Sequence, residues 1–219
     1  EVEQLEPAAG VPLGDRHHQP QVGGDELGLR LCPFRQLPLE GAPLVEREVG
    51  AADLQGAAEL VLLANCSPDN QLDTLAQVEK PAFVVSDSMD LWVSIARDRL
   101  LDVLQKTDLF VINDSEAKQF METKNVITAG HRLLELGPRH VVIKKGEHGA
   151  LLFGRGGSFF SAGAYPLHEV HDPTGAGDSF AGGIAGHLAS LGKQSFEFSD
   201  LARAVVYGTV MASYNCESF

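Results

Sequence analysis

The 219-residue sequence has no long apolar run and no excess of positive charge. No run approaches the about 20 apolar residues that a membrane-spanning helix needs, and no apolar segment precedes a signal-peptide cleavage site. The sequence contains 17 Lys and Arg residues and 30 Asp and Glu residues, which gives a formal net charge of −13. We therefore expect neither a membrane nor a nucleic acid as partner, because a nucleic-acid backbone requires a basic surface.

Cysteine and paired histidine are also scarce. The three cysteines, Cys32, Cys66 and Cys216, are scattered and odd in number. Their spacing fits neither a disulfide framework nor a zinc site, so reduced thiols in the cytoplasm are the simplest expectation. The eight histidines include no H-x-x-x-H or H-E-x-x-H pair, and the sequence therefore gives no sign of a zinc-protease site.

Regular periodicity is missing from the first fifty residues. They contain six of the eleven prolines, one aromatic residue and no lysine. This composition predicts a loop, an extended segment or disorder. We expect an irregular segment over 1–55 and a folded core over 56–219. A natural divergent arm, a truncated chain and a misassigned stretch all stay open as explanations of the first segment.

From residue 59 onward, short apolar runs alternate with helix-like segments. This alternation indicates βαβ units, and hence an α/β fold with a mostly parallel sheet that is covered on both faces. Strands are expected over 59–65, 81–86, 108–113, 141–144, 150–153 and 158–161. Helices are expected over 69–78, 93–104, 115–121, 126–136, 177–191 and 201–214.

The run HDPTGAGDSFAGG, residues 171–183, carries the strongest chemical signal. Its Gly-Ala-Gly stretch precedes an apolar helix, so backbone N–H groups free of bulky side chains can bind an anion there. Asp178 then lies in the first turn, beside that anion. An acid in this place is suited to take a proton from a hydroxyl group that attacks a phosphoryl group. A plain glycine turn followed by a dipole-favoured Asp is the alternative.

Polar residues also follow three expected strands. Asn113 and Glu116 have the spacing of a capping box at the start of a helix. Asp87 is expected at the carboxyl edge of the sheet, where open α/β sheets bind ligands. An Asx turn that caps the next helix is an equal alternative for Asp87. Lys144 ends a later strand. A lysine there can neutralise phosphate charge, and a side chain that points into water is an equal alternative. Trp92 is expected to fill the core.

The run Asp172-Pro-Thr-Gly-Ala-Gly-Asp178, followed by Ser-Phe-Ala-Gly-Gly, resembles the C-terminal signature of the ribokinase-like (PfkB) carbohydrate kinases. The resemblance covers about residues 59–219 and implies a ribokinase-like three-layer sandwich. The N-terminal strands, glycine signature and lid of that family are not recognisable here. The resemblance implies phosphorylation of a hydroxyl group on a sugar or nucleoside-like molecule by ATP, with Mg²⁺ and a monovalent cation such as K⁺, and a homodimer as the assembly.

Site roles follow from the resemblance residue by residue. It implies that Asp178 is the catalytic base and that the amides of Gly175, Ala176 and Gly177 form the anion hole. The remaining roles that it implies are Asp87 for the substrate; Glu116, Asp172 and Thr174 for metal ions; and Asn113, Lys144, Gly146, Gly149, Gly208 and Thr209 for ATP. Because the N-terminal signature is not recognisable, a non-catalytic, nucleotide-binding relative that acts through protein interaction is the alternative.

Overall fold

The computed structural model describes residues 29–31 and 60–218, which contain one seven-stranded sheet in the order β1-β2-β3-β4-β5-β6-β7. Strands β1 to β5 are parallel, and β6 and β7 are antiparallel to their neighbours. The strands are β1 (Leu29–Leu31), β2 (Leu60–Leu63), β3 (Phe83–Asp87), β4 (Leu109–Asn113), β5 (His140–Lys144), β6 (Ala150–Gly154) and β7 (Phe159–Ala162). The mostly parallel α/β sheet that the sequence predicts is thereby confirmed.

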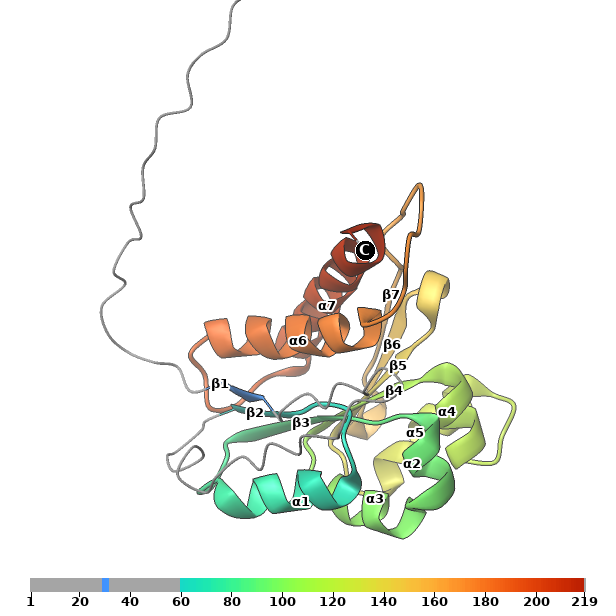
Figure 1. Ribbon diagram of the computed structural model, residues 1–219. Coiled ribbons are helices and arrows are strands. Elements are labelled where there is room, and N and C mark those ends of the chain that lie inside the picture. The colour runs from blue at the N-terminus through green and yellow to red at the C-terminus, as the bar shows by residue number, and fades with distance from the viewer. Residues whose placement is uncertain (1–28, 32–59, 219) are drawn as a thin grey trace, which may run out of the picture.

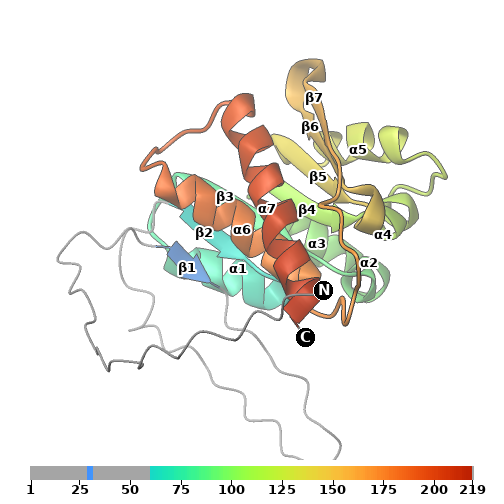
Figure 2. The ribbon, with the colours of Figure 1, turned by 90° about the horizontal axis from the view of Figure 1, so that it is seen from above.

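The helices divide between the two faces of the sheet (Figure 1). They are α1 (Pro68–Gln77), α2 (Asp90–Ile95), α3 (Arg97–Leu104), α4 (Asp114–Phe120), α5 (Val126–Glu135), α6 (Ala176–Ser190) and α7 (Phe198–Ser218). From β2 to β5 each strand lies beside the preceding one, so right-handed crossovers place α1 to α5 on the same face. Helices α6 and α7 cover the other face (Figure 2), which completes the three-layer sandwich.

The core is split by the sheet because neighbouring residues of a strand point to opposite faces. In β2, Leu60 and Leu62 belong to the cluster that packs under α6, whereas Val61 and Leu63 belong to a cluster on the α1 side. All four side chains are buried. A continuous apolar run is therefore required of each central strand, and this is the pattern that the sequence shows.

One predicted helix, over 93–104, is wrong. The structure has two helices there, α2 and α3, because Ala96 at their junction leaves helical geometry with φ −135° and ψ 34°. Helix α2 packs against α4 and α3 packs against α1, so each needs its own direction. Trp92 is also not a core residue: it is partly exposed, and its indole Nε1 donates a hydrogen bond to Asn65 Oδ1 at 3.2 Å.

Strand β1 was not predicted, since it lies within the segment of irregular composition. It pairs in parallel with β2, and Leu29 lies opposite Leu60 in the register. Residues 1–28 and 32–59 lie outside the described residues, so the division near residue 55 stays a prediction. No helix in the described part of the chain is long and apolar enough to cross a membrane.

Helix α6 should depend on its buried face for stability. Ile184 is fully buried against the sheet, whereas Ile95 is 68% exposed. We expect Ile184→Ala to lower the free energy of unfolding by about 2–5 kcal/mol, because it removes buried methyl groups and leaves a cavity. The matched change Ile95→Ala should stay within about 0.5 kcal/mol of the unaltered protein. Urea unfolding followed by circular dichroism would measure both; equal losses would contradict this account of the core.

Candidate active site

The loop that enters α6 makes a tight turn over residues 173–176. Pro173 O accepts a hydrogen bond from Ala176 N–H at 3.1 Å, and Gly175 has φ 80° and ψ −3°. These values match the third position of a type II turn, which requires glycine because its φ is positive. Helix α6 then begins at Ala176, with Gly175 as its N-cap and no side chain capping it.

This turn leaves backbone donors open at the positive end of α6. Ser179 N–H donates to Gly175 O at 2.9 Å, which is the first regular bond of the helix. Among the described residues, no protein acceptor pairs with the N–H groups of Gly177 and Asp178. Ala176 N–H is used within the turn. The geometry therefore offers two adjacent free donors, and Asp178 carries both one of them and a partly exposed carboxylate.

Lys144 joins three segments that are far apart in the sequence. Its Nζ lies 3.3 Å from both carboxylate oxygens of Asp87, at the end of β3. The same Nζ lies 3.1 Å from the place where a Cβ on Gly177 would lie. The Lys144 side chain is only 12% exposed, so the alternative of a lysine that points into water is wrong. The structure thus brings the ends of β3 and β5 and the start of α6 together.

Asp87 is a buried carboxyl group at the carboxyl edge of the sheet. Burial raises its pKa, Lys144 opposes that rise, and the neighbouring charge of Asp178 adds to it. Its Oδ1 accepts a hydrogen bond from Ser88 N–H at 2.9 Å. Asp87 does not cap the next helix, because the N-cap of α2 is Met89 and lacks a side-chain hydrogen bond. The capping alternative for Asp87 is therefore wrong.

Two residues near Asp87 were not predicted. The buried Gln71 of α1 donates from Nε2 to Ala64 O at 3.1 Å and to Asp87 O at 2.9 Å, which ties the end of β2 to the end of β3. The buried Ser88 Oγ has no hydrogen-bond partner in the described part of the chain. Neither residue had a sequence signal, because Gln71 falls within the helix expected over 69–78 and an isolated serine after a strand is common.

Asn113 and Glu116 form a local pair at the start of α4. Glu116 accepts hydrogen bonds from Asn113 N–H at 3.1 Å and from Asn113 Nδ2 at 2.7 Å. Glu116 is buried, and its pKa is raised by burial against the lowering effect of Asn113 and Lys144. Asn113 pairs with Lys144 in the register of β4 and β5. The predicted capping interaction is present, and it holds a carboxylate within the electrostatic reach of Lys144.

The predicted glycines have distinct settings. Gly149 has φ 83°, and a Cβ there would come within 2.0 Å of Ala162 O, so this position accepts only glycine. Gly146 has φ 55° and open space where a Cβ would lie. Gly208 of α7 is buried, and a Cβ there would lie 2.8 Å from Phe180 O. Gly208 therefore has a clear packing role between α6 and α7.

The remaining predicted residues lie in the exposed loop before α6 and on α7. Thr174 N–H donates to Asp172 Oδ1 at 2.8 Å, and this bond lowers the pKa of Asp172. Thr209 Oγ1 donates to Val205 O at 3.0 Å within α7. Among the described residues, no three His, Cys, Asp or Glu side chains are grouped to hold a metal ion. Mg²⁺ often keeps waters and substrate phosphates among its ligands, and this is the manner of binding that an isolated Glu116 could support.

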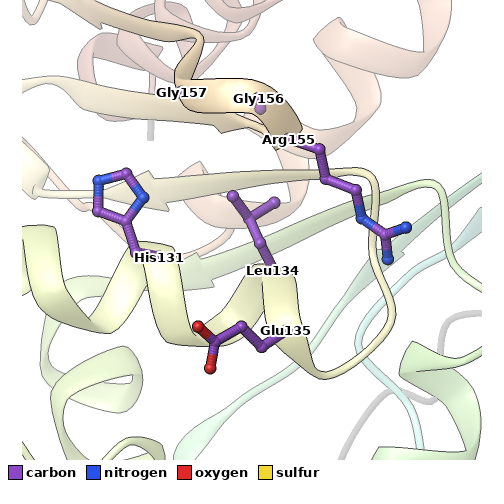
Figure 3. A pocket seen from close by; sticks show the side chains of 7 residues that line it. His131, Leu134, Glu135, Arg155, Gly156 and Gly157 are labelled. Carbon is purple, nitrogen blue, oxygen red and sulfur yellow. The ribbon is translucent and has the colours of Figure 1, made fainter.

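A separate pocket lies between α5 and the turn that joins β6 to β7 (Figure 3). Its volume is about 530 Å³, and its lining includes His131, Glu135 and Arg155. Its wall also includes Gly154, which pairs with His140 at the start of β5. The pocket is therefore at the edge of the sheet opposite to Lys144, and it contains none of the predicted site residues.

Comparison with known proteins identifies the family. Residues 35–219 match the family described as pfkB family carbohydrate kinase. The chain belongs to this family, as its signature loop indicated. The match begins upstream of residue 59, in a part of the sequence where no resemblance was recognised.

Individual relatives support the same family. The chain is 37% identical over 94 residues to a cytidine kinase of Thermococcus kodakarensis, across 42% of this chain and 33% of that protein. It is 32% identical over 123 residues to a 2-dehydro-3-deoxygluconokinase of Thermoproteus tenax, across 54% of this chain and 37% of the relative. The matches thus span about a third of the length of these curated relatives.

Solved structures share the fold. The aminoimidazole riboside kinase from Salmonella enterica aligns with a TM-score of 0.60 and 19% identity, over 73% of this chain and 57% of that one. The ribokinase from Thermotoga maritima aligns with a TM-score of 0.58 and 24% identity, over 73% and 50% of the two chains. The ribokinase-like architecture is therefore confirmed.

The raised pKa of Asp87 has a consequence for stability. The folded protein holds the Asp87 proton more tightly than the unfolded chain, so this group stabilises the fold at low pH. Its contribution is lost as pH rises from about 4, the ordinary pKa of Asp, through the raised value. Asp87→Asn lacks this loss, so its free energy of unfolding relative to the unaltered protein should increase with pH. Urea unfolding at several pH values would measure it, with the exposed Asp98→Asn as control. A relative stability that decreases with pH would contradict the dominance of burial.

Proposed function

We propose that the protein transfers the γ-phosphoryl group of ATP to a hydroxyl group of a sugar or nucleoside-like small molecule. The observation that carries this proposal is the start of α6, where the free N–H groups of Gly177 and Asp178 meet the Asp178 carboxylate and the Lys144 amino group. Donors for an anion and a base for a hydroxyl group are the two parts that phosphoryl transfer requires. Membership of the pfkB family supports the same assignment.

In the proposed reaction, Asp178 takes the proton of the substrate hydroxyl group as its oxygen attacks the γ-phosphorus. The new O–P bond forms while the bond from the γ-phosphorus to the bridging oxygen breaks, and ADP leaves. The Gly177 and Asp178 amides donate to the oxygens of the transferred group, where negative charge must be stabilised. Gly175 holds the turn, and its own N–H, which has no acceptor among the described residues, is proposed as a further donor. Ala176 N–H serves the turn and not the anion.

Lys144 is proposed to serve the phosphates. The buried Asp87 carboxylate holds its Nζ beside Gly177, so the amino group lies next to the unpaired N–H groups of Gly177 and Asp178. A phosphate oxygen arriving there would share Lys144 with Asp87. Asn113, Gly146, Gly149, Gly208 and Thr209 remain proposed ATP contacts.

The carboxylates are proposed to serve the substrate and the metal ions. Asp87 and the unpartnered Ser88 hydroxyl are proposed to bind the acceptor, since a buried hydroxyl without a partner is rare. Glu116 fits an outer contact to Mg²⁺ through water, and Asp172 and Thr174 are the proposed contacts of a monovalent cation. Bound Mg²⁺ would neutralise phosphate charge. A homodimer and a cytoplasmic location stay predictions.

Removing the proposed base gives the sharpest test. We expect Asp178→Ala to lower kcat by about 10²–10⁴, the scale of general acid–base catalysis, with ATP still bound. Asp98→Ala, which removes an exposed acid of α3, should leave kcat unchanged. Steady-state ADP release and ATP titration calorimetry measure the two quantities. An Asp178→Ala variant that turns over at nearly the normal rate would contradict the assignment.

The acceptor is tested by substrate stimulation. We expect one member of a panel of sugars, deoxy-sugar acids and nucleosides to raise ADP release by purified protein above the rate with ATP and water alone. Product analysis by ³¹P NMR should then show a phosphate monoester. ATP binding without stimulation by any acceptor would contradict a kinase and favour a nucleotide-binding module.

A further inference from the structure

Asn215, in the last turn of α7, contacts the loop before α6 with one end of its amide and the first turn of α6 with the other. Its Nδ2 donates to Thr174 O at 2.7 Å, and its Oδ1 accepts from Ser179 Oγ at 3.2 Å. His171 N–H donates to Cys216 O at 2.9 Å and ties the same loop to the same turn of α7. Figure 2 shows the end of α7 beside the loop that leads into α6.

The sequence of this loop also fits a second helix start, three residues upstream. Asp172 Oδ1 already accepts from Thr174 N–H, which is the bond that an Asp N-cap makes to the second helical residue. Pro173 between them is the residue favoured at the first helical position. With Asp172 as N-cap, α6 would simply begin at Pro173.

The two starts differ in what happens to the anion donors. In a helix beginning at Pro173, each N–H donates to the carbonyl four residues earlier, so Gly177 N–H would bond Pro173 O and Asp178 N–H would bond Thr174 O. Neither donor would then be available to a phosphate. In the structure, Thr174 O instead accepts from Asn215, and the positive φ of Gly175 interrupts the helix.

We propose that Asn215 is a positioning residue that selects between these two helix starts. By holding Thr174 O, it keeps the type II turn and leaves the Asp178 amide without an internal acceptor. A residue in this place must donate to a carbonyl and accept from a hydroxyl group, and the asparagine amide does both. The effect on phosphoryl transfer rests on the proposed function; the state of the Asp178 amide does not.

Amide hydrogen exchange tests the selection directly. In Asn215→Ala, we expect exchange at the Asp178 amide to slow by about fivefold, the factor that one backbone hydrogen bond provides, because that amide now finds Thr174 O. A merely structural role would speed exchange throughout the loop. Glu217→Ala, an exposed change in the same turn of α7, should leave Asp178 exchange as it was. Unchanged or faster exchange at Asp178 in a folded Asn215→Ala variant would overturn the proposal.

A second variant and a kinetic measurement complete the test. Asn215→Asp keeps the shape and the acceptor for Ser179 but loses the donor to Thr174 O, so it should slow Asp178 exchange as Asn215→Ala does, and it serves if Asn215→Ala does not fold. Both variants should lower kcat by at least about tenfold. This loss is smaller than the factor of about 10²–10³ that follows the complete removal of an anion donor, and the KM for ATP should change less than kcat. If exchange at Asp178 slows in the Asn215 variants while Asp178→Ala keeps its activity, the proposed kinase base is refuted and the selection by Asn215 stands. If exchange at Asp178 is normal in the Asn215 variants while Asp178→Ala is inactive, only the selection by Asn215 is refuted.

Discussion

The amino group of Lys144 is the point on which the candidate site depends. It is the cation that faces the buried Asp87 carboxylate and acts on the pKa of Glu116, and it lies against the backbone of Gly177. Without it, the buried Asp87 carboxylate would face the charges of Glu116 and Asp178 with no compensating cation, and like charges repel. Gly177 is matched to it, because any side chain there would meet the amino group.

The sheet topology explains why these groups meet. A sheet that grows strand by strand with right-handed crossovers uses α1 to α5 on one face, and the other face must be covered by helices from the end of the chain. Helix α6 therefore crosses that face with its first turn at the carboxyl ends of the strands, where β3, β4 and β5 present Asp87, Asn113 and Lys144. The buried carboxylates cost stability at neutral pH, a cost that proteins commonly carry at functional sites.

Most elements could be predicted because their signals are local. Apolar runs locate β2 to β7, and the Gly-Ala-Gly-Asp run locates the start of α6 within one residue. The break at Ala96 could not be predicted, since α2 and α3 separate in order to pack on different helices. Strand β1 is similarly defined by its pairing with β2 and not by its composition. Trp92 was misplaced because its hydrogen-bond partner, Asn65, lies far away in the sequence, in the bend between β2 and α1.

The sequence by itself determined the fold class, the family signature and the chemical groups at α6, because strand periodicity, glycine turns and helix starts are set by residues within a few positions of one another. Only the tertiary structure decided which groups meet and which amides stay free. The pairing of Lys144 with Asp87, the tie from Gln71 to β3 and the hold of Asn215 on Thr174 each join distant segments. The local sequence of the loop is compatible with two starts of α6. The hydrogen bond from Asn215 to Thr174 O distinguishes them, and only the fold brings this donor from the end of α7 to that carbonyl.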